Sequence, residues 1–190
     1  MIEVKNLSKA FGDRVVLSEL SLAFPEGSTT ALMSPSGSGK TTLLRILTGL
    51  DKKFEGEVTL PEAISYCPQD VSLLPWYSMK KNLTIFLGDN EETLKRIDAA
   101  LKAVGLDGAE DKKPKELSGG MCQRVALLRA WLYPADTVIL DEPFKALDTE
   151  TRDTLIRYLL ATKSPNRTVI FTTHSEEEAA AFADRIIRLS

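Results

Sequence analysis

Short apolar runs alternate with amphipathic stretches along most of the chain. Continuous apolar or β-branched runs predict four strands: Thr29–Met33, Thr137–Leu140, Thr168–Thr172 and, as an edge, Arg185–Leu189. Apolar residues at helical spacing predict three helices: about Lys40–Thr48, about 151–162 and about 175–183. Strands that alternate with helices are typical of an α/β fold with a mostly parallel sheet and helices on both of its faces.

Two parts of the chain depart from this alternation. Three runs near the start predict strands without intervening helices, and hence an antiparallel β portion beside the main sheet: Met1–Leu7, Val15–Phe24 and Glu57–Leu60. From about 73 to 117 the pattern is mainly helical, with its clearest helix at Glu91–Val104 and a polar loop at 107–116. We therefore expect a single domain, residues 1–190, with a helical subdomain inserted at about 73–117.

Composition narrows the class of protein. The 190 residues, 43% hydrophobic and 27% charged, suit one soluble domain, and a net charge of -3 argues against nucleic acid as the main partner. No apolar run approaches the roughly 20 residues that cross a bilayer, and the start has no apolar secretion segment. Any role at a membrane is therefore that of a peripheral subunit. Cys67 and Cys122, without nearby histidine ligands, are expected to be reduced thiols of a cytoplasmic protein.

A glycine-rich segment follows the first predicted strand of the main sheet and opens a predicted helix, which is the setting of a phosphate-binding loop. Glycines let backbone N–H groups converge on phosphate oxygens, and the helix N-terminus adds a positive end. We expect Lys40 to reach the β- and γ-phosphates and Thr41 to bind Mg²⁺. Ser34 stands where the usual pattern begins with glycine, and a positive φ would strain it. The candidate nucleotide-binding residues of the loop are Ser34, Pro35, Ser36, Gly37, Ser38, Gly39, Lys40, Thr41 and Thr42.

Two carboxylates end the apolar run Thr137–Leu140, at the sheet edge where open α/β folds bind ligands. Asp141 is expected to hold Mg²⁺, directly or through water. Glu142 is expected to orient or deprotonate the attacking water. In isolation the pair could be an acidic turn before Pro143, and the Lys40 loop favours the catalytic interpretation.

Three single residues are further candidates for the site. His174, the only histidine, follows the strand Thr168–Thr172 and is placed to contact a γ-phosphate. Gln69 follows a predicted strand at Ala63–Cys67 and could touch Mg²⁺ or water, although a loop glutamine is usually solvated. Phe11, after the first strand, is either a core residue or a platform for adenine, and such stacking is worth roughly 1–3 kcal/mol.

A second phosphate-recognition element lies far along the chain. In the segment Leu117–Arg124, Ser118, Gly119 and Gly120 form a small turn that opens a basic, apolar helix. One chain that carries both elements suggests a nucleotide held between two surfaces, and therefore a dimer.

An apolar cluster with an aromatic residue comes just after Gln69. It is formed by Leu73, Leu74, Pro75 and Trp76. It either packs within the helical subdomain or forms an exposed docking patch for a partner helix, because exposed apolar patches rimmed by charge mark interaction sites.

The ordered set of candidates resembles the ATP-binding subunit of an ATP-binding-cassette transporter from Ile2 to Leu189. Its members are Phe11, the Lys40 loop, Gln69, Leu117–Gly120, Asp141-Glu142, Ala146-Leu147-Asp148 and His174. The resemblance implies a P-loop NTPase that hydrolyses ATP with Mg²⁺ in a head-to-tail dimer with a second copy or a paralogous subunit. ATP would lie between the Lys40 loop of one subunit and the Ser118–Gly120 turn of the other, with Asp148 linking the two sites.

The same resemblance implies integral-membrane permease subunits, docked near Leu73–Trp76 at the inner face of the cell membrane. That segment and Met121 are most similar to importers of the nitrate, sulfonate, taurine and thiamine-precursor group. Lys145 departs from the pattern, since relatives usually carry a small residue there. A short stretch between Lys40 and Gln69 implies a trimmed β subdomain, and an end soon after the last strand implies no regulatory C-terminal domain.

Two alternatives remain at this point. The first is a soluble member of the same superfamily that works on ribosomes or DNA. Such proteins typically carry two cassettes or a long coiled coil, whereas this chain has one cassette and no sustained heptads. The second is a regulatory protein that holds ATP without turnover, which the intact Lys40, Asp141, Glu142 and His174 argue against.

Overall fold

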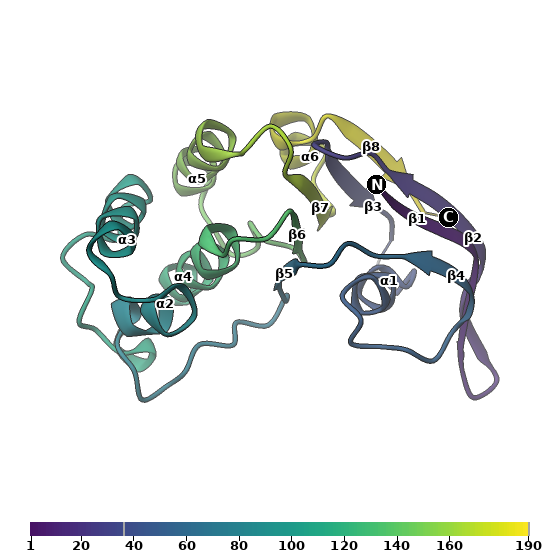
Figure 1. Ribbon diagram of the computed structural model, residues 1–190, viewed down its shortest axis with the longest axis horizontal. Coiled ribbons are helices and arrows are strands. Elements are labelled where there is room, and N and C mark those ends of the chain that lie inside the picture. Colours follow the sequence, from purple (N-terminus) through teal and green to yellow (C-terminus); the bar gives the residue numbers. More distant parts are fainter. Residues whose placement is uncertain (36, 190) are drawn as a thin grey trace. The chain divides into compact units, whose positions relative to one another are not determined.

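The computed structural model describes residues 1–35 and 37–189, and the chain divides into two compact units (Figure 1). The first unit comprises Met1–Tyr66, Ala135–Glu142 and Ser164–Ser190. The second comprises Cys67–Pro134 and Pro143–Lys163, and so contains the predicted helical stretch and continues beyond both of its ends.

A five-stranded sheet is the main element of the first unit. Its strands, in spatial order, are β5 (Ile64–Cys67), β6 (Thr137–Leu140), β7 (Thr168–Thr173), β3 (Thr29–Met33) and β8 (Arg185–Arg188). The pairs β6–β7, β7–β3 and β3–β8 are parallel, and every residue of β3, β6 and β7 is buried. The predicted mostly parallel sheet, with its last strand at an edge, is therefore confirmed.

An antiparallel sheet of three strands belongs to the same unit and confirms the predicted antiparallel β portion. Its order is β2 (Arg14–Phe24), β1 (Ile2–Phe11) and β4 (Glu55–Thr59). Phe11 is the last residue of β1 and pairs with Arg14, so the prediction that the strand ends at Leu7 and that Phe11 follows it is wrong. Asn6 adopts a φ of 50°, and the pairing register shifts between Val4 and Leu7, which interrupts the apolar alternation in the middle of the strand.

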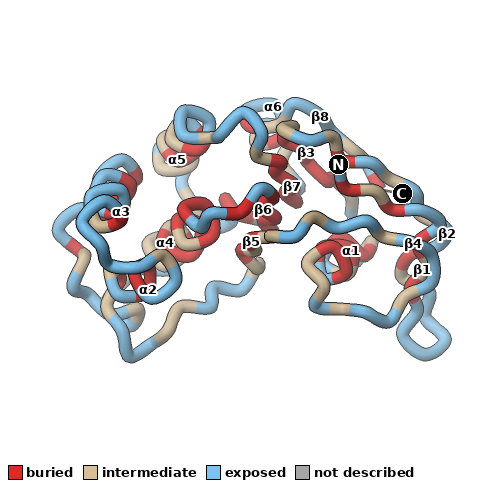
Figure 2. Tube along the Cα trace, viewed as in Figure 1, coloured by how far each residue is buried: buried red, intermediate tan, exposed pale blue. Residues whose placement is uncertain are grey.

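The core of the first unit lies between the antiparallel sheet, the parallel sheet and helix α1 (Lys40–Leu47) (Figure 2). Apolar side chains from α1 join those of β1 and β2: Leu43, Leu44, Ile46, Leu47, Ile2, Val4, Leu7, Leu17 and Phe24. Helix α6 (Glu176–Phe182) begins after Ser175, whose hydroxyl accepts the N–H of Glu178 and caps the helix.

Helices make up most of the second unit. They are α2 (Met79–Leu87), α3 (Glu91–Ala103), the 3₁₀ helix η1 (Pro114–Glu116), α4 (Gly119–Leu132) and α5 (Thr149–Thr162). Helix α4 packs against α2 and α3 and is buried along most of its length. The predicted loop 107–116 ends in η1, because Pro114 starts a turn and the Glu116 carboxylate accepts the Lys113 N–H at 2.8 Å. Among the described helices, none has the length and apolar character that crossing a membrane requires.

Candidate nucleotide site

The loop from Ser34 to Gly39 joins β3 to α1 in the first unit. Gly39 precedes α1 with a φ of 90°, and a Cβ there would lie 2.8 Å from Leu17 Cδ2 and 2.9 Å from Val16 Cγ1. Only glycine therefore lets the helix begin this close to β2. Ser36, one of the predicted loop residues, lies outside the described residues. The strain expected at Ser34 is not found, since its φ is not positive.

Lys40 is buried at the start of α1 and its ammonium group is turned into the loop. Nζ donates to the Ser34 carbonyl at 2.6 Å, the Ser34 Oγ at 3.2 Å and the Pro35 carbonyl at 3.1 Å. Burial lowers the pKa of Lys40, and the negative charges of Glu142 and Asp141 oppose that shift. The loop thus holds a cation opposite two carboxylates.

Asp141 is buried at the carboxyl end of β6, with an exposed fraction of 1%. One carboxylate oxygen accepts the Thr41 hydroxyl at 2.9 Å, and the other accepts the Thr172 hydroxyl at 2.6 Å. A hydroxyl and a carboxylate side by side are hard oxygen donors of the kind that Mg²⁺ prefers, so Thr41 and Asp141 fit such an ion.

Glu142 lies beside His174, with Oε1 3.0 Å from Nε2. Its φ of 47° is left-handed, and such a conformation costs a non-glycine residue on the order of 1–3 kcal/mol. Its N–H donates to the Thr172 Oγ1 at 2.8 Å, which helps to hold the turn. The structure therefore brings Glu142 and His174 together next to Asp141, and the contact of His174 with a γ-phosphate stays a prediction.

Thr172 is the residue of this cluster that sequence reasoning missed. It is fully buried, and one hydroxyl joins Asp141 to the backbone of Glu142. Leu140 pairs with Phe171, so the next residues, Asp141 and Thr172, meet at the sheet edge. The signal in the sequence is a hydroxyl residue that follows the apolar centre of the strand, at its carboxyl end.

The predicted second phosphate element lies in the second unit. Ser118 is exposed and caps α4, and its Oγ accepts the Met121 N–H at 3.2 Å. A Cβ on Gly120 would lie 3.4 Å from Leu147 Cδ2, so this turn packs against the segment that leads into α5. Asp148 caps α5 by accepting the N–H and the hydroxyl of Thr151 at 2.9 and 2.7 Å, and these bonds lower the pKa of Asp148.

The remaining residues that the sequence singles out differ in their exposure. Phe11 is 55% exposed, which excludes the core interpretation. Gln69 is half-buried in the second unit, and its contact with a metal stays a prediction. Trp76 is 64% exposed at the tip of a turn before α2. Cys67 is buried, Cys122 is half-buried, and neither of these two cysteines is in a disulfide.

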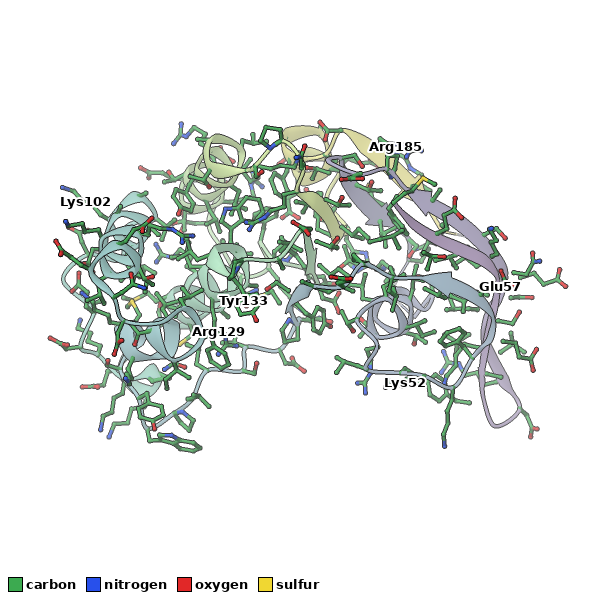
Figure 3. The ribbon with its side chains drawn as sticks, in the orientation of Figure 1. Lys52, Glu57, Lys102, Arg129, Tyr133 and Arg185 are labelled. Carbon is green, nitrogen blue, oxygen red and sulfur yellow. The ribbon has the colours of Figure 1, made fainter. Side chains whose placement is uncertain are left out.

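Arg129 of α4 fixes the segment that leads into the Trp76 turn. Arg129, labelled in Figure 3, donates to the Ser72 carbonyl at 2.9 Å and lies 5.1 Å from the centroid of the Phe86 ring in α2. Burial lowers the pKa of Arg129. The guanidinium thus ties the chain after Gln69 to both helices.

Comparison with known proteins identifies a matching family and similar relatives. The pattern of the family described as "ABC transporter" matches residues 17–145. The aliphatic sulfonates import ATP-binding protein SsuB 2 of Rhodococcus jostii (strain RHA1) is 45% identical over 194 residues, which cover 99% of this chain and 78% of the relative. SsuB 1 of Paracoccus denitrificans (strain Pd 1222) is 42% identical over 191 residues, with 99% and 78% covered.

Solved structures give the same result. A dimeric post-hydrolysis state of an ATP-binding cassette bound to ADP and Pi has a TM-score of 0.88 and 30% identity, covering 100% of this chain and 94% of that one. A dimeric bacterial ABC transporter cassette has a TM-score of 0.87 and 32% identity, with the same coverage. The fold and the site thus define a P-loop NTPase of the ATP-binding-cassette class. The chain belongs to the ABC transporter family, as an ATP-binding and ATP-hydrolysing subunit. The predicted resemblance to the sulfonate-type group is confirmed.

Proposed function

We propose that the chain energises the import of an aliphatic sulfonate or a closely similar anion. In this proposal it is one ATPase domain, residues 1–190, with a helical part at about 73–117. The observation that carries the proposal is the cluster in the first unit, where Lys40, Thr41, Asp141, Glu142 and His174 gather around one sheet edge. The choice of solute rests on the names of the relatives at 45% and 42% identity.

Binding of the phosphates falls to the Ser34–Thr42 loop and to Lys40 in this proposal. Thr41 and Asp141, with Gln69, would hold Mg²⁺, which when bound offsets negative charge on the β- and γ-phosphates. Lys40 exchanges its loop carbonyls for phosphate oxygens and keeps a positive charge beside them. Phe11, exposed at the end of β1, stacks on the adenine.

Glu142 and His174 act in the hydrolysis step of this proposal. Glu142 orients the attacking water and accepts its proton as the new bond to the γ-phosphorus forms and the bond to the bridging oxygen breaks. His174 contacts the γ-phosphate, and its position 3.0 Å from Glu142 also holds that carboxylate in place.

A second subunit completes the site. Ser118, Gly119 and Gly120 would contact the γ-phosphate of the ATP held by the other subunit, since a capped helix N-terminus favours anions. Asp148 would link the two sites across the interface. The partner is a second copy of this chain or a paralogous ATPase subunit, and the dimeric state of the two similar solved structures supports such an arrangement.

Transport requires contact with membrane-embedded permease subunits. We place this contact near Leu73, Leu74, Pro75 and Trp76, with the protein in the cytoplasm at the inner face of the membrane. The exposure of Trp76 supports the assignment, since a large aromatic side chain that projects into solvent is a common interface anchor.

The Glu142→Gln variant tests the catalytic assignment. It removes the carboxylate base and keeps the size of the side chain, so we expect ATP binding to be unchanged and hydrolysis to fall by at least about 100-fold. Gel filtration with ATP and Mg²⁺ should show an accumulated dimer. Glu91→Gln, an exposed change at the start of α3, is the control. Turnover at the wild-type rate in Glu142→Gln would remove Glu142 from the mechanism.

A further inference from the structure

Lys9 is a buried lysine in β1, two residues before Phe11, with an exposed fraction of 7%. Its Nζ lies 2.8 and 2.9 Å from the two carboxylate oxygens of Asp51 and also donates to the carbonyl of Lys53. Three acceptors satisfy the three N–H donors of the ammonium group. A lysine this deeply buried is rare unless it is paired, and here the pairing fixes the position of the charge.

The same ammonium group lies over the ring of Phe11. Nζ is 4.8 Å from the ring centroid, within the range of a cation–π contact. Phe11 ends β1 next to a tight turn and pairs with Arg14, and more than half of its surface is exposed. An aromatic side chain at such a place has several accessible rotamers in the absence of a contact that selects one.

Asp51 connects this contact to the phosphate loop. It follows α1, and its N–H donates to the Arg45 carbonyl at 3.0 Å, while its carboxylate accepts the Lys53 N–H at 2.9 Å. The hydrogen bond from Lys9 lowers the pKa of Asp51, which favours the ionised carboxylate. One end of α1 thus carries the phosphate loop and the other anchors the cation under Phe11.

We infer that Lys9 is a positioning residue for the base of the nucleotide: it holds the Phe11 ring with one face toward the ammonium and the other open for adenine. A cation on one face draws electron density from the ring, which favours stacking of an electron-rich purine on the opposite face. This inference rests on the proposed stacking of adenine on Phe11, and Lys9 acts only through that ring.

Two ligands and a double-mutant cycle test it. ATP and inorganic tripolyphosphate, which lacks the base, are titrated by calorimetry against wild type, Lys9→Met, Phe11→Ala and the double variant. We expect Lys9→Met to weaken ATP binding about three- to tenfold and to leave tripolyphosphate unchanged. In the Phe11→Ala background, Lys9→Met should cause no further loss of ATP affinity.

Two control variants distinguish the loss of the positioning role of Lys9 from a general loss of stability. Lys5→Met changes a more exposed lysine of the same strand and should bind both ligands normally. Lys9→Met/Asp51→Asn removes both charges of the pair, so it carries the test if the unpaired Asp51 unfolds the single variant; thermal unfolding of each variant is recorded.

Each outcome decides one claim. If Phe11→Ala binds ATP like wild type, the proposed stacking fails, and this inference fails with it. If Phe11→Ala weakens ATP binding but Lys9→Met has the same effect with and without Phe11, or weakens tripolyphosphate equally, the stacking stands and the role of Lys9 is overturned.

Discussion

Ser34 illustrates how one residue can set the strength of nucleotide binding. Lys40 donates both to its carbonyl and to its hydroxyl, and the hydroxyl also contacts that of Ser38. Glycine, the usual residue at this place, would keep the carbonyl contact and lose the hydroxyl contact. In the proposed mechanism Lys40 leaves these acceptors to reach phosphate oxygens, so the Ser34 hydroxyl would compete with ATP.

We therefore expect Ser34→Gly to tighten ATP binding about three- to tenfold, the size of one modest hydrogen bond to a charged group. Titration with a fluorescent ATP analogue measures the change. Ser34→Ala is the matched control for backbone freedom and should behave like Ser34→Gly. Unchanged or weaker binding in both variants would show that the hydroxyl does not compete with ATP.

For single residues, the sequence predicts those that reach the sheet edge simply because they come directly after a strand. Lys40, Thr41, Asp141, Glu142 and His174 follow strands whose carboxyl ends coincide in a parallel sheet. Thr172 and Lys9 escape such reasoning for a physical reason. The role of Thr172 depends on the register of β6 against β7, and the partner of Lys9 lies in a turn 42 residues further on.

At the scale of elements, long apolar runs and caps are predictable, and interruptions are not. The buried strands β3, β6 and β7 stand out because each is a continuous run of apolar or β-branched residues, as expected of strands buried on both faces. The full length of β1 cannot be recognised in the same way, because the irregularity around Asn6 reverses the alternation of its side chains. The sequence predicts α2 only as part of a mainly helical stretch, although a cap marks its start: the Ser78 hydroxyl accepts the Lys81 N–H.

The turn before α2 is the element that we expect to dock on a permease. Asn82 is fully buried and holds the turn: its side chain accepts the Leu74 N–H at 2.7 Å and donates to the carbonyls of Leu74 and Ser78 at 3.1 and 3.0 Å. Trp76 projects from this turn and is 64% exposed. One amide thus determines how the aromatic side chain is presented.

Trp76→Ala should abolish co-purification with a multi-span membrane protein under mild detergent, and ATP hydrolysis by the isolated subunit should persist. Asn82→Ala should have the same effect and also lower the stability of the protein by about 1–3 kcal/mol, because it leaves buried backbone groups unpaired. Leu160→Ala, an exposed apolar change on α5, is the control. Recovery of a ribosome or DNA in place of a membrane protein would favour the soluble alternative.

At the scale of the whole molecule, the two proposed phosphate-binding elements belong to different compact units, the Lys40 loop to the first and Ser118–Gly120 to the second. The sequence predicts both elements, because each is a local turn that opens a helix. Which Lys40 loop shares a nucleotide with which Ser118–Gly120 turn is a property of the dimer, and no local sequence pattern encodes it. A test of the head-to-tail arrangement therefore has to combine two different subunits in one dimer.

Complementation between two inactive variants provides that test. Lys40→Ala disables the loop half of a site, and Ser118→Arg disables the turn half, so neither variant alone should hydrolyse ATP. In a mixed head-to-tail dimer, one site receives both defects, and the other combines the intact loop of one subunit with the intact turn of its partner. Random pairing at equal concentrations should therefore restore about a quarter of the wild-type sites.

Phosphate release measured across mixing ratios should peak at equal amounts of the two variants. If loop and turn acted within one chain, every chain in the mixture would carry a defect, and no activity would return. Nucleotide binding by Ser118→Arg alone should remain normal, because its own Lys40 loop is intact. A mixture as inactive as its components, in which both variants still bind each other, would contradict the shared site.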